Sequence, residues 1–327
     1  MWFEKLVGFQ EKSPDQVRQN LLINGDQLIS KVNGRAFQMG TLEIPSLRDL
    51  RNCKDVSDLP KSQLKVSEGI GDVQQLHTLS ISNGAVFQAA SQFNLLEMVS
   101  PSVTPESGID GYESDLTQGP ACAIACGAGT IFRNYFVKIN GQTGQTHQHQ
   151  IDCLDDIGKH LNNELFHLWE MQNGYAMLNQ SGLLHINKEL AKLNEAAYEE
   201  LKGKLKVGIQ KDTEVTFRDS GKIVTQIYCS ALPVAYAHIE SIYWDRFARL
   251  ILEASYEATL LAALENYQKT DNNLVFLTLV GGGAFGNEPY WIIQSLKKVL
   301  DLFKHLPLDV RIVSYGRSNS ALRSIVD

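Results

Sequence analysis

The chain has 327 residues, with 30 Lys and Arg against 37 Asp and Glu, and a net charge of −7 when its eight histidines are neutral. Hydrophobic residues make up 43% of the sequence, which excludes a disordered or fibrous chain and predicts a large buried core. The negative charge argues against nonspecific nucleic-acid binding, which needs a basic surface. At about 150 residues per domain, this length corresponds to roughly two domains.

Cysteine usage and the N-terminal residues indicate a cytosolic protein. The five cysteines form no CxxC pair, which is typical of reduced thiols. The first residues include Glu4 and Glu11 and contain no long apolar run, so we expect no secretory signal and no membrane span. His147, His149 and Cys153 are too few ligands for a structural zinc site. We therefore expect no metal, no cofactor, no nucleic acid and no membrane partner.

The first 62 residues are predicted to be a β-rich extension. Asn24-Gly25 and Asn33-Gly34 are typical of hairpin turns between strands. A charged, loop-like link then lies between Pro45 and Pro60. After this link the residue types predict a buried strand, a tightly packed helix and a β-branched strand, at 85–87, 121–126 and 130–139.

Residues 140–206 look least like a core, and the remainder of the chain is the most regular part. The polar run at 141–150 predicts an exposed loop, and residues 187–205 have helical spacing. A strand–loop–helix–strand unit closes the chain and favours an α/β fold with a largely parallel sheet flanked by helices. The elements expected after residue 206 are strands at 214–217 and 223–232, a helix at 238–267, a strand at 274–280, a helix at 291–305 and a strand at 310–315.

The loop Gly281-Gly282-Gly283-Ala284-Phe285-Gly286-Asn287 is the strongest local signal. Glycines after a strand allow backbone N–H groups to approach phosphate, and a helix start adds its positive dipole. A Walker A loop is excluded because Gly286 is not followed by Lys and Ser or Thr. The GxGxxG spacing matches a dinucleotide fingerprint, but only about 40 residues remain and the next strand ends without an acidic residue. A packing turn without a ligand is the third interpretation.

Two further segments contain residues that could bind a ligand or take part in catalysis. The strand at 86–90 runs into Gln92 and Asn94, and the segment Gly108-Ile109-Asp110-Gly111 is followed by more carboxylates. Such a group of carboxylates can supply a general base, although each one taken alone fits a solvated acidic loop. The acidic residues in this region are Glu97, Glu106, Asp110, Glu113 and Asp115.

Together these segments resemble the macrodomain superfamily. VFQAASQFN is similar to the macrodomain strand that ends in a ribose-contacting asparagine, and GIDGYESD is similar to the GVDG segment. TLVGGGAFGN is similar to the second phosphate loop, in particular that of poly(ADP-ribose) glycohydrolases, and EGIGDV is similar to the element that holds adenine. The segments occur in the macrodomain order, and the whole chain is most similar to a divergent branch that includes a bacterial effector.

The resemblance implies a macrodomain-like, three-layer α/β domain over residues 63–327, with an insertion at 140–206. It implies an ADP-ribosyl hydrolase that releases ADP-ribose from a modified protein, with ubiquitin as one candidate, in the cytoplasm or, for an effector, in a host cytosol. Asp110 would be the catalytic carboxylate, with Asp115, Glu106 and Glu97 as alternates. The implied ligand-binding residues are Asp72, Val73, Gln92, Asn94, Gly108, Ile109, Gly281, Gly282, Gly283, Ala284, Phe285, Gly286 and Asn287.

Within this resemblance the roles divide by ligand group. Asp72 would accept from the adenine amino group, the amides of 282–286 would hold the pyrophosphate, and Asn94 would hold ribose hydroxyls. The first loop has Leu95-Leu96-Glu97-Met98 where the family has a run of glycines. That departure favours an alternative function, a reader that binds ADP-ribose without cleaving it, whereas the carboxylates favour the hydrolase.

Overall fold

The computed structural model describes residues 1–53 and 62–326. Within them, seven strands form one sheet, in the spatial order β4 (Thr41–Glu43), β11 (Gly208–Glu214), β12 (Ile223–Cys229), β6 (Val86–Ala90), β13 (Leu274–Leu277), β14 (Asp309–Ser314) and β5 (Lys65–Ile70). The strands from β12 to β5 pair in parallel, and β11 pairs antiparallel with both β12 and the edge strand β4. The prediction of a largely parallel sheet is confirmed.

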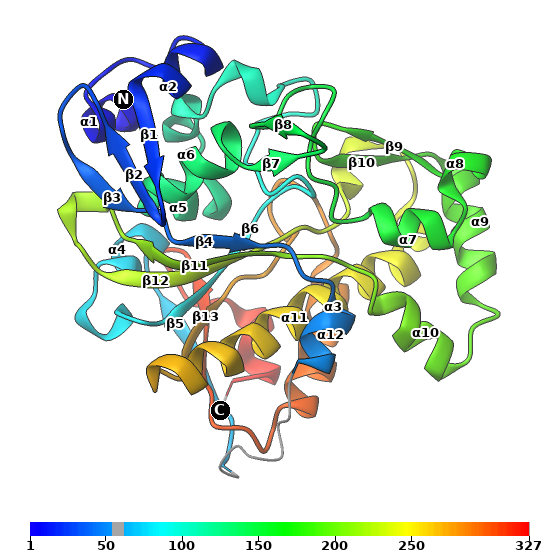
Figure 1. Cartoon of the computed structure of the whole chain (residues 1–327). Coiled ribbons are helices and arrows are strands. Elements are labelled where there is room, and N and C mark those ends of the chain that lie inside the picture. Colours follow the sequence, from blue (N-terminus) through cyan, green and yellow to red (C-terminus); the bar gives the residue numbers. More distant parts are fainter. Residues whose placement is uncertain (54–61, 327) are drawn as a thin grey trace.

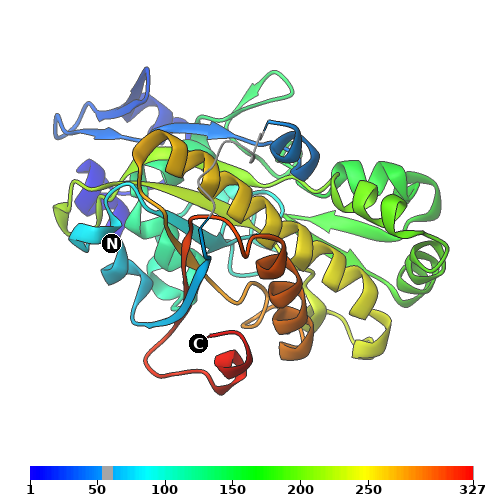
Figure 2. The same ribbon diagram turned by 90° about the horizontal axis from the view of Figure 1, so that it is seen from below.

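Helices cover both faces of this sheet (Figures 1 and 2). The long helix α11 (Asp245–Thr270) packs on β6, β12 and β13, and α12 (Pro289–Leu302) lies against it. The other face carries α4 (Val73–His77), α5 (Gln118–Ala125) and α6 (Gly127–Tyr135). Central parallel strands are buried on both faces and therefore have continuous apolar runs, as in Leu274–Leu277, where every residue is buried. The three-layer α/β architecture is confirmed.

The N-terminal segment contains helices as well as the expected strands. Glycines with positive φ, Gly25 at 61° and Gly34 at 72°, form the predicted turns of a three-stranded sheet. Two helices precede this sheet, and β4 follows it into the central sheet. The elements before β4 are α1 (Trp2–Val7), α2 (Pro14–Asn20), β1 (Leu21–Asn24), β2 (Gln27–Ser30) and β3 (Ala36–Gln38).

The charged link after Pro45 was predicted to be a loop, and this prediction is wrong where the chain is described. Residues Leu47–Asn52 form helix α3, which begins with a capping box between Ser46 and Asp49. Its buried Leu47 and Leu50 face the core, and the helix packs on α11. The part of the predicted link at 54–61 and its closing Pro60 lie outside the described residues.

Residues 130–139 were predicted to form a strand, but most of them belong to helix α6. Ala128, Ile131 and Tyr135 recur at helical spacing and are buried in a second hydrophobic core, which α6 shares with α1. Burial on this helical face outweighs the local preference of β-branched and aromatic residues for strands. The predicted packed helix at 121–126 is confirmed by α5.

The segment 140–206 forms a largely helical lobe beside one end of the sheet (Figure 1). The helical prediction for 187–205 is confirmed at 187–190 and 195–202, with a break at 191–194, whereas the loop at 141–150 is less exposed than predicted. Gln145 is only 2% exposed, and its amide donates to the Asn94 and Arg133 carbonyls. From 138 onward the elements are β7 (Lys138–Ile139), β8 (Gln142–Thr143), α7 (Asp155–His160), α8 (Asn163–Phe166), β9 (Trp169–Gln172), β10 (Tyr175–Leu178), α9 (Gln180–Leu190) and α10 (Glu195–Lys202).

Short 3-10 helices connect many of these elements. The long helix predicted from His238 begins only at Asp245 because such a turn precedes it. Two others form most of the segment 105–115, which carries the predicted acidic residues. The 3-10 helices are η2 (Ser80–Ser82), η3 (Pro105–Ser107), η4 (Asp110–Ser114), η5 (Phe217–Asp219), η6 (Val234–Tyr236), η7 (Ser241–Tyr243) and η8 (Ser320–Ser324).

Candidate active site

A crevice opens where the neighbouring strands β6 and β13 end. They pair only at Val86 and Phe87, and beyond these residues β6 continues alone beside β12. The Gln118 side chain fills the vacated position, because its amide accepts from the Ala90 N–H at 2.8 Å and donates to the Gln88 carbonyl at 2.8 Å. Ligands of open α/β sheets bind at such carboxyl ends of strands.

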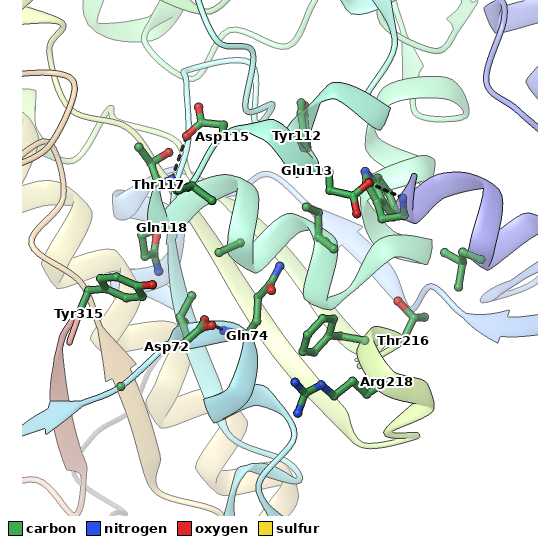
Figure 3. A pocket seen from close by; sticks show the side chains of 18 of the residues that line it. Asp72, Gln74, Tyr112, Glu113, Asp115, Thr117, Gln118, Thr216, Arg218 and Tyr315 are labelled. Carbon is green, nitrogen blue, oxygen red and sulfur yellow. Dashed lines mark hydrogen bonds between the residues drawn. The ribbon is translucent and has the colours of Figure 1, made fainter.

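Two cavities meet at this crevice. The α5 cavity, about 540 Å³, extends across α5 from Asp72 and Tyr315 at one end to Arg218 at the other (Figure 3). Its volume lies within the range of small-molecule sites, about 300–1,000 Å³. The glycine-loop cavity, about 190 Å³, lies beside it. Four residues line both cavities, Asp115, Thr117, Gln118 and Thr278.

The glycine-loop cavity is lined by five segments far apart in the sequence: the loop after β6, the start of α5, the hairpin β9–β10, the segment after β12 and the glycine loop. Of the predicted site residues, the structure brings seven together here, including two candidate carboxylates. These seven are Gln92, Glu97, Asp115, Gly281, Gly283, Ala284 and Phe285.

Glu97 is a buried carboxyl group that faces this cavity. It is 3% exposed, its Oε1 has no hydrogen-bond partner among the described residues, and Gly119 leaves room for its Oε2. Burial raises the pKa of Glu97 well above its ordinary value, and the nearby negative charge of Asp115 raises it further, against the opposing effect of Arg133. A carboxyl group of this kind holds its proton at a pH where an exposed glutamate is ionised.

Asp115 is the second carboxylate at the site and differs from Glu97 in its exposure. It follows η4, is partly exposed, and accepts a hydrogen bond from the Thr117 N–H at 2.8 Å (Figure 3). Because it borders both cavities, its carboxylate is accessible to a ligand that spans them. The site therefore combines a buried carboxyl group whose pKa is raised with a second, partly exposed carboxyl group.

The glycine loop turns its backbone toward the same cavity. Gly281 has φ 78°, and a Cβ there would lie 2.5 Å from the Ala231 Cβ, so only glycine fits. The N–H groups of Gly283, Ala284 and Phe285 make no hydrogen bond within the described part of the chain. Consecutive free N–H groups form a concave anion site of the kind that holds phosphate.

The other loop residues have supporting contacts. The Phe285 ring packs against Tyr175 and Tyr236, with ring centroids 5.3 and 5.8 Å apart. Asn287 is buried and donates to the Leu232 carbonyl at 2.8 Å, which anchors the loop. Gly286 lies close to Ala235. Gly282 faces away from the crevice, into a third cavity of about 730 Å³ that α12 borders.

The loop after β6 is held by its own amides. The Gln92 carboxamide accepts from the Met98 N–H at 2.8 Å and donates to its carbonyl, which fixes the loop around Glu97. Asn94, expected to hold ribose hydroxyls, is fully buried outside the cavity lining, where it bonds Gln150 at 2.8 Å and the Leu96 N–H. The structure therefore gives Asn94 a structural contact with the 140–206 segment.

Four predicted residues lie away from the cavities. The Asp110 carboxylate accepts from the Phe3 N–H at the start of α1, and Ile109 is buried in the second core. Glu106 accepts from the His147 N–H at 2.8 Å. Gly108, with φ 89°, packs against the Glu11 carboxylate. The structure thus places Asp115, and not Asp110, at the crevice.

Asp72 and Val73, which the resemblance assigns to adenine, line one end of the α5 cavity. The Asp72 carboxylate caps α4 by accepting from the Gln74 N–H at 2.9 Å. Tyr315, which is 81% exposed, follows β14 at the same end (Figure 3). An exposed aromatic ring beside a hydrogen-bond acceptor suits a purine base.

Two residues of the site could not be singled out from the residues alone. Gln118 precedes the run at 121–126 that was read as packing, although Thr117-Gln118-Gly119-Pro120 has the signature of a helix start. Tyr175 comes from the hairpin β9–β10 within the insertion, and its hydroxyl donates to the Met98 carbonyl. No local pattern in the sequence indicates that this hairpin reaches the cavity.

No protein-family model and no curated protein matches this sequence. Among solved structures, poly(ADP-ribose) glycohydrolase from Thermomonospora curvata aligns with 10% identity and a TM-score of 0.45, over 94% of this chain and 92% of that chain. The enzyme from Deinococcus radiodurans, solved in complex with ADP-ribose, aligns with 9% identity and a TM-score of 0.45, over 87% and 95%. Similarity at this level assigns no function to the chain.

The described residues were compared with the requirements of a metal-ion site and of a membrane-spanning helix, and they meet neither. They contain no group of three or more His, Cys, Asp or Glu side chains arranged to hold a metal ion. None of their helices combines the length and apolarity needed to cross a membrane.

Proposed function

We propose that this protein is an ADP-ribosyl hydrolase. One observation carries the proposal: Glu97, buried and with a free carboxyl oxygen, shares a cavity with Asp115 and with the free N–H groups of the glycine loop. Glycoside hydrolysis uses such a pair, an acid whose pKa is raised and a second carboxylate. The resemblance to macrodomains, read from the ordered motifs, supports ADP-ribose as the sugar nucleotide.

The two cavities suggest how ADP-ribose lies. Its adenine would sit between Asp72 and Tyr315 in the α5 cavity, and its pyrophosphate would accept from the amides of 283–285. The distal ribose would then occupy the glycine-loop cavity, against Glu97 and beneath the rings of Tyr175 and Phe285. Asp115, which borders both cavities, would face the anomeric carbon.

The chemistry follows from the two carboxyl groups. Glu97 donates its proton to the oxygen that links the distal ribose to the modified side chain, and the bond from the anomeric carbon to that oxygen breaks. The carboxylate of Asp115 stabilises the oxocarbenium-like transition state and accepts a proton from the water that attacks the anomeric carbon. The products are ADP-ribose and the unmodified side chain. Asp115 then releases the proton it accepted to solvent, and Glu97 regains a proton from solvent.

We propose a modified protein as the substrate, with ubiquitin as one candidate, and the cytosol as its location. The five cysteines are all free thiols, and four of them are buried, which agrees with a reducing compartment. The partly exposed Asp115 at the cavity rim is compatible with a macromolecular leaving group.

A reader that binds ADP-ribose without cleaving it is the second candidate. The positions of Asp110 and Asn94 favour this function, because these two residues of the resembling motifs make structural contacts and do not line the cavity. In a reader, Glu97 would serve only to shape the loop.

Isothermal titration with ADP-ribose, followed by incubation with an ADP-ribosylated protein, separates these functions. A hydrolase binds ADP-ribose and releases it from the protein at a rate proportional to enzyme concentration. Binding without release would leave the reader, and absence of binding would overturn both. Inclusion of ADP-ribosylated ubiquitin beside a second modified protein tests the substrate proposal in the same assay.

A further inference from the structure

Glu11, between α1 and α2, makes an unusually complete set of contacts with the acidic segment 105–115. Its Oε2 accepts from the N–H groups of Ile109 and Asp110 at 2.8 and 2.7 Å, and its Oε1 accepts from the Tyr135 hydroxyl at 2.6 Å. Two of these three hydrogen bonds hold the backbone at the start of η4, and hydrogen bonds to an ionised carboxylate are stronger than neutral ones.

Gly108 shows how closely this carboxylate approaches the chain. A Cβ at Gly108 would lie 2.4 Å from the Glu11 Oε2, and its φ of 89° is one that residues with a side chain rarely adopt. The glycine therefore serves the contact with Glu11. The following residues extend the same attachment, because the carboxylates of Asp110 and Glu113 accept from the N–H groups of Phe3 and Trp2 at the start of α1.

The helix η4 connects this attachment to both candidate catalytic groups. Within η4, the hydroxyl of the buried Tyr112 accepts from the Glu97 N–H at 2.9 Å. At the end of η4, the Asp115 N–H donates to the Tyr112 carbonyl at 3.1 Å. Tyr112 also lies in the second core with Trp2, Leu96 and Met98, the last two of which flank Glu97. One short helix thus contacts the backbone at Glu97 and at Asp115.

We propose that Glu11 is a positioning residue: by fixing the first turn of η4, it sets the placement of Glu97 and Asp115 relative to each other. This inference rests on the proposed hydrolase function. In this inference the GIDG segment supports the two carboxyl groups and is itself held by the N-terminal residues. Trp2–Glu11 is then part of the active-site architecture. Small misplacements of catalytic groups are costly, with about 1 Å reducing a rate by about 100-fold.

The test compares Glu11→Gln and Glu11→Ala with a matched variant, Glu214→Gln. Glu214, on β11, also accepts from a backbone N–H, that of Gln38 at 2.9 Å, but it lies outside the lining of both cavities. Steady-state release of ADP-ribose gives kcat and KM, titration gives the Kd for ADP-ribose, and thermal unfolding shows that each variant is folded. Glu11→Gln keeps the size of the side chain and guards against loss of the fold in Glu11→Ala.

We expect kcat to fall about 10-fold in Glu11→Gln and about 100-fold in Glu11→Ala, with the Kd for ADP-ribose within about threefold of the original protein. Glu214→Gln should retain its kcat. An unchanged kcat in a folded Glu11→Ala overturns the inference, as does an equal loss in Glu214→Gln. If the protein without substitutions releases no ADP-ribose, the proposed function fails and not the inference about Glu11. The two failures are therefore distinguishable.

Discussion

The glycine loop at 281–287 and the acidic segment at 105–115 were both recognised in the sequence, yet they differ in how they reach the site. Most of the glycine loop borders the cavity, and three of its N–H groups are free. Of the acidic segment's carboxylates, Asp115 alone lies at the glycine-loop cavity, while Asp110 and Glu106 bind backbone N–H groups elsewhere.

The difference has a physical cause. Glycines allow the positive φ and the close approach that this turn needs, and the strand before it and the helix after it fix where that backbone lies. A carboxylate has no such local constraint, and its role depends on which donors the rest of the fold supplies. In the acidic segment the donor to Asp110 comes from α1 and the donor to Glu106 from His147, and no local motif indicates the position of either donor.

The largest expected effect on kcat is found by comparing two buried glutamates, one with an unpaired carboxyl oxygen and one in an ion pair. Glu97 has a free oxygen at the cavity, whereas Glu253 on α11, 2% exposed, pairs with Lys298 at 2.7 Å. Glu97→Gln should lower kcat by about 10²–10⁴-fold because it removes the proton donor, with little change in the Kd for ADP-ribose. Glu253→Gln should leave kcat unchanged and cost about 1.5–3 kcal/mol of stability, since it weakens the charge-assisted hydrogen bond from the half-exposed Lys298.

Steady-state assays and urea unfolding of both variants measure these effects. Equal activity in Glu97→Gln and the original protein would remove Glu97 from the mechanism and leave the reader as the better function.

The second prediction tests the acidic segment itself. Asp115→Asn should lower kcat about 100-fold or more, because the carboxylate that activates water is lost. Asp110→Asn should leave kcat within about threefold and reduce stability by about 1 kcal/mol, the usual cost of a weakened helix cap. Rates of ADP-ribose release and thermal unfolding decide between them. The reverse order of rates would restore Asp110 as the catalytic residue.

These contrasts show which parts of the fold and of the candidate site could be predicted from the sequence. The strands and helices of the closing unit were predicted because β13 and α12 have apolar patterns that tertiary contacts reinforce. Helix α6 was missed because its β-branched residues favour a strand when they are read locally. Asp110 accepts from the Phe3 N–H of α1 and lies outside both cavities, and Tyr175 reaches the cavity from an insertion. Neither contact has a signature within a short window of sequence.

The third prediction compares one glycine from each loop. Gly281→Ala should destabilise the protein by about 1–3 kcal/mol and weaken ADP-ribose binding, because alanine there is strained at positive φ and meets Ala231. Gly111→Ala, within η4, has open space at its Cβ and should be tolerated. Thermal unfolding and titration with ADP-ribose measure both. Equal tolerance at the two positions would mean that the glycine loop adjusts without loss.

The smallest effect is a pH dependence of stability that Glu97 introduces. Burial raises the pKa of Glu97 above its ordinary value of 4.5, so the folded protein holds this proton more strongly than the unfolded chain does. The stabilising contribution is complete below about pH 4.5 and is lost as the pH rises toward the raised value, at about 1.4 kcal/mol per pH unit. Glu97→Gln cannot ionise and should escape this loss.

The variant should therefore be more stable than the original protein at pH 8, by about 1 kcal/mol or more, with a difference that shrinks toward pH 5. Urea unfolding of both proteins across this range measures it. Other groups, including His77, whose pKa burial lowers to about 4, titrate in both proteins and cancel in the difference. Parallel stability curves would show that Glu97 is ionised in the folded protein and cannot act as the acid. If the stability difference widens as the pH rises and Glu97→Gln also loses kcat, then the Glu97 proton serves the reaction and its loss at high pH destabilises the fold.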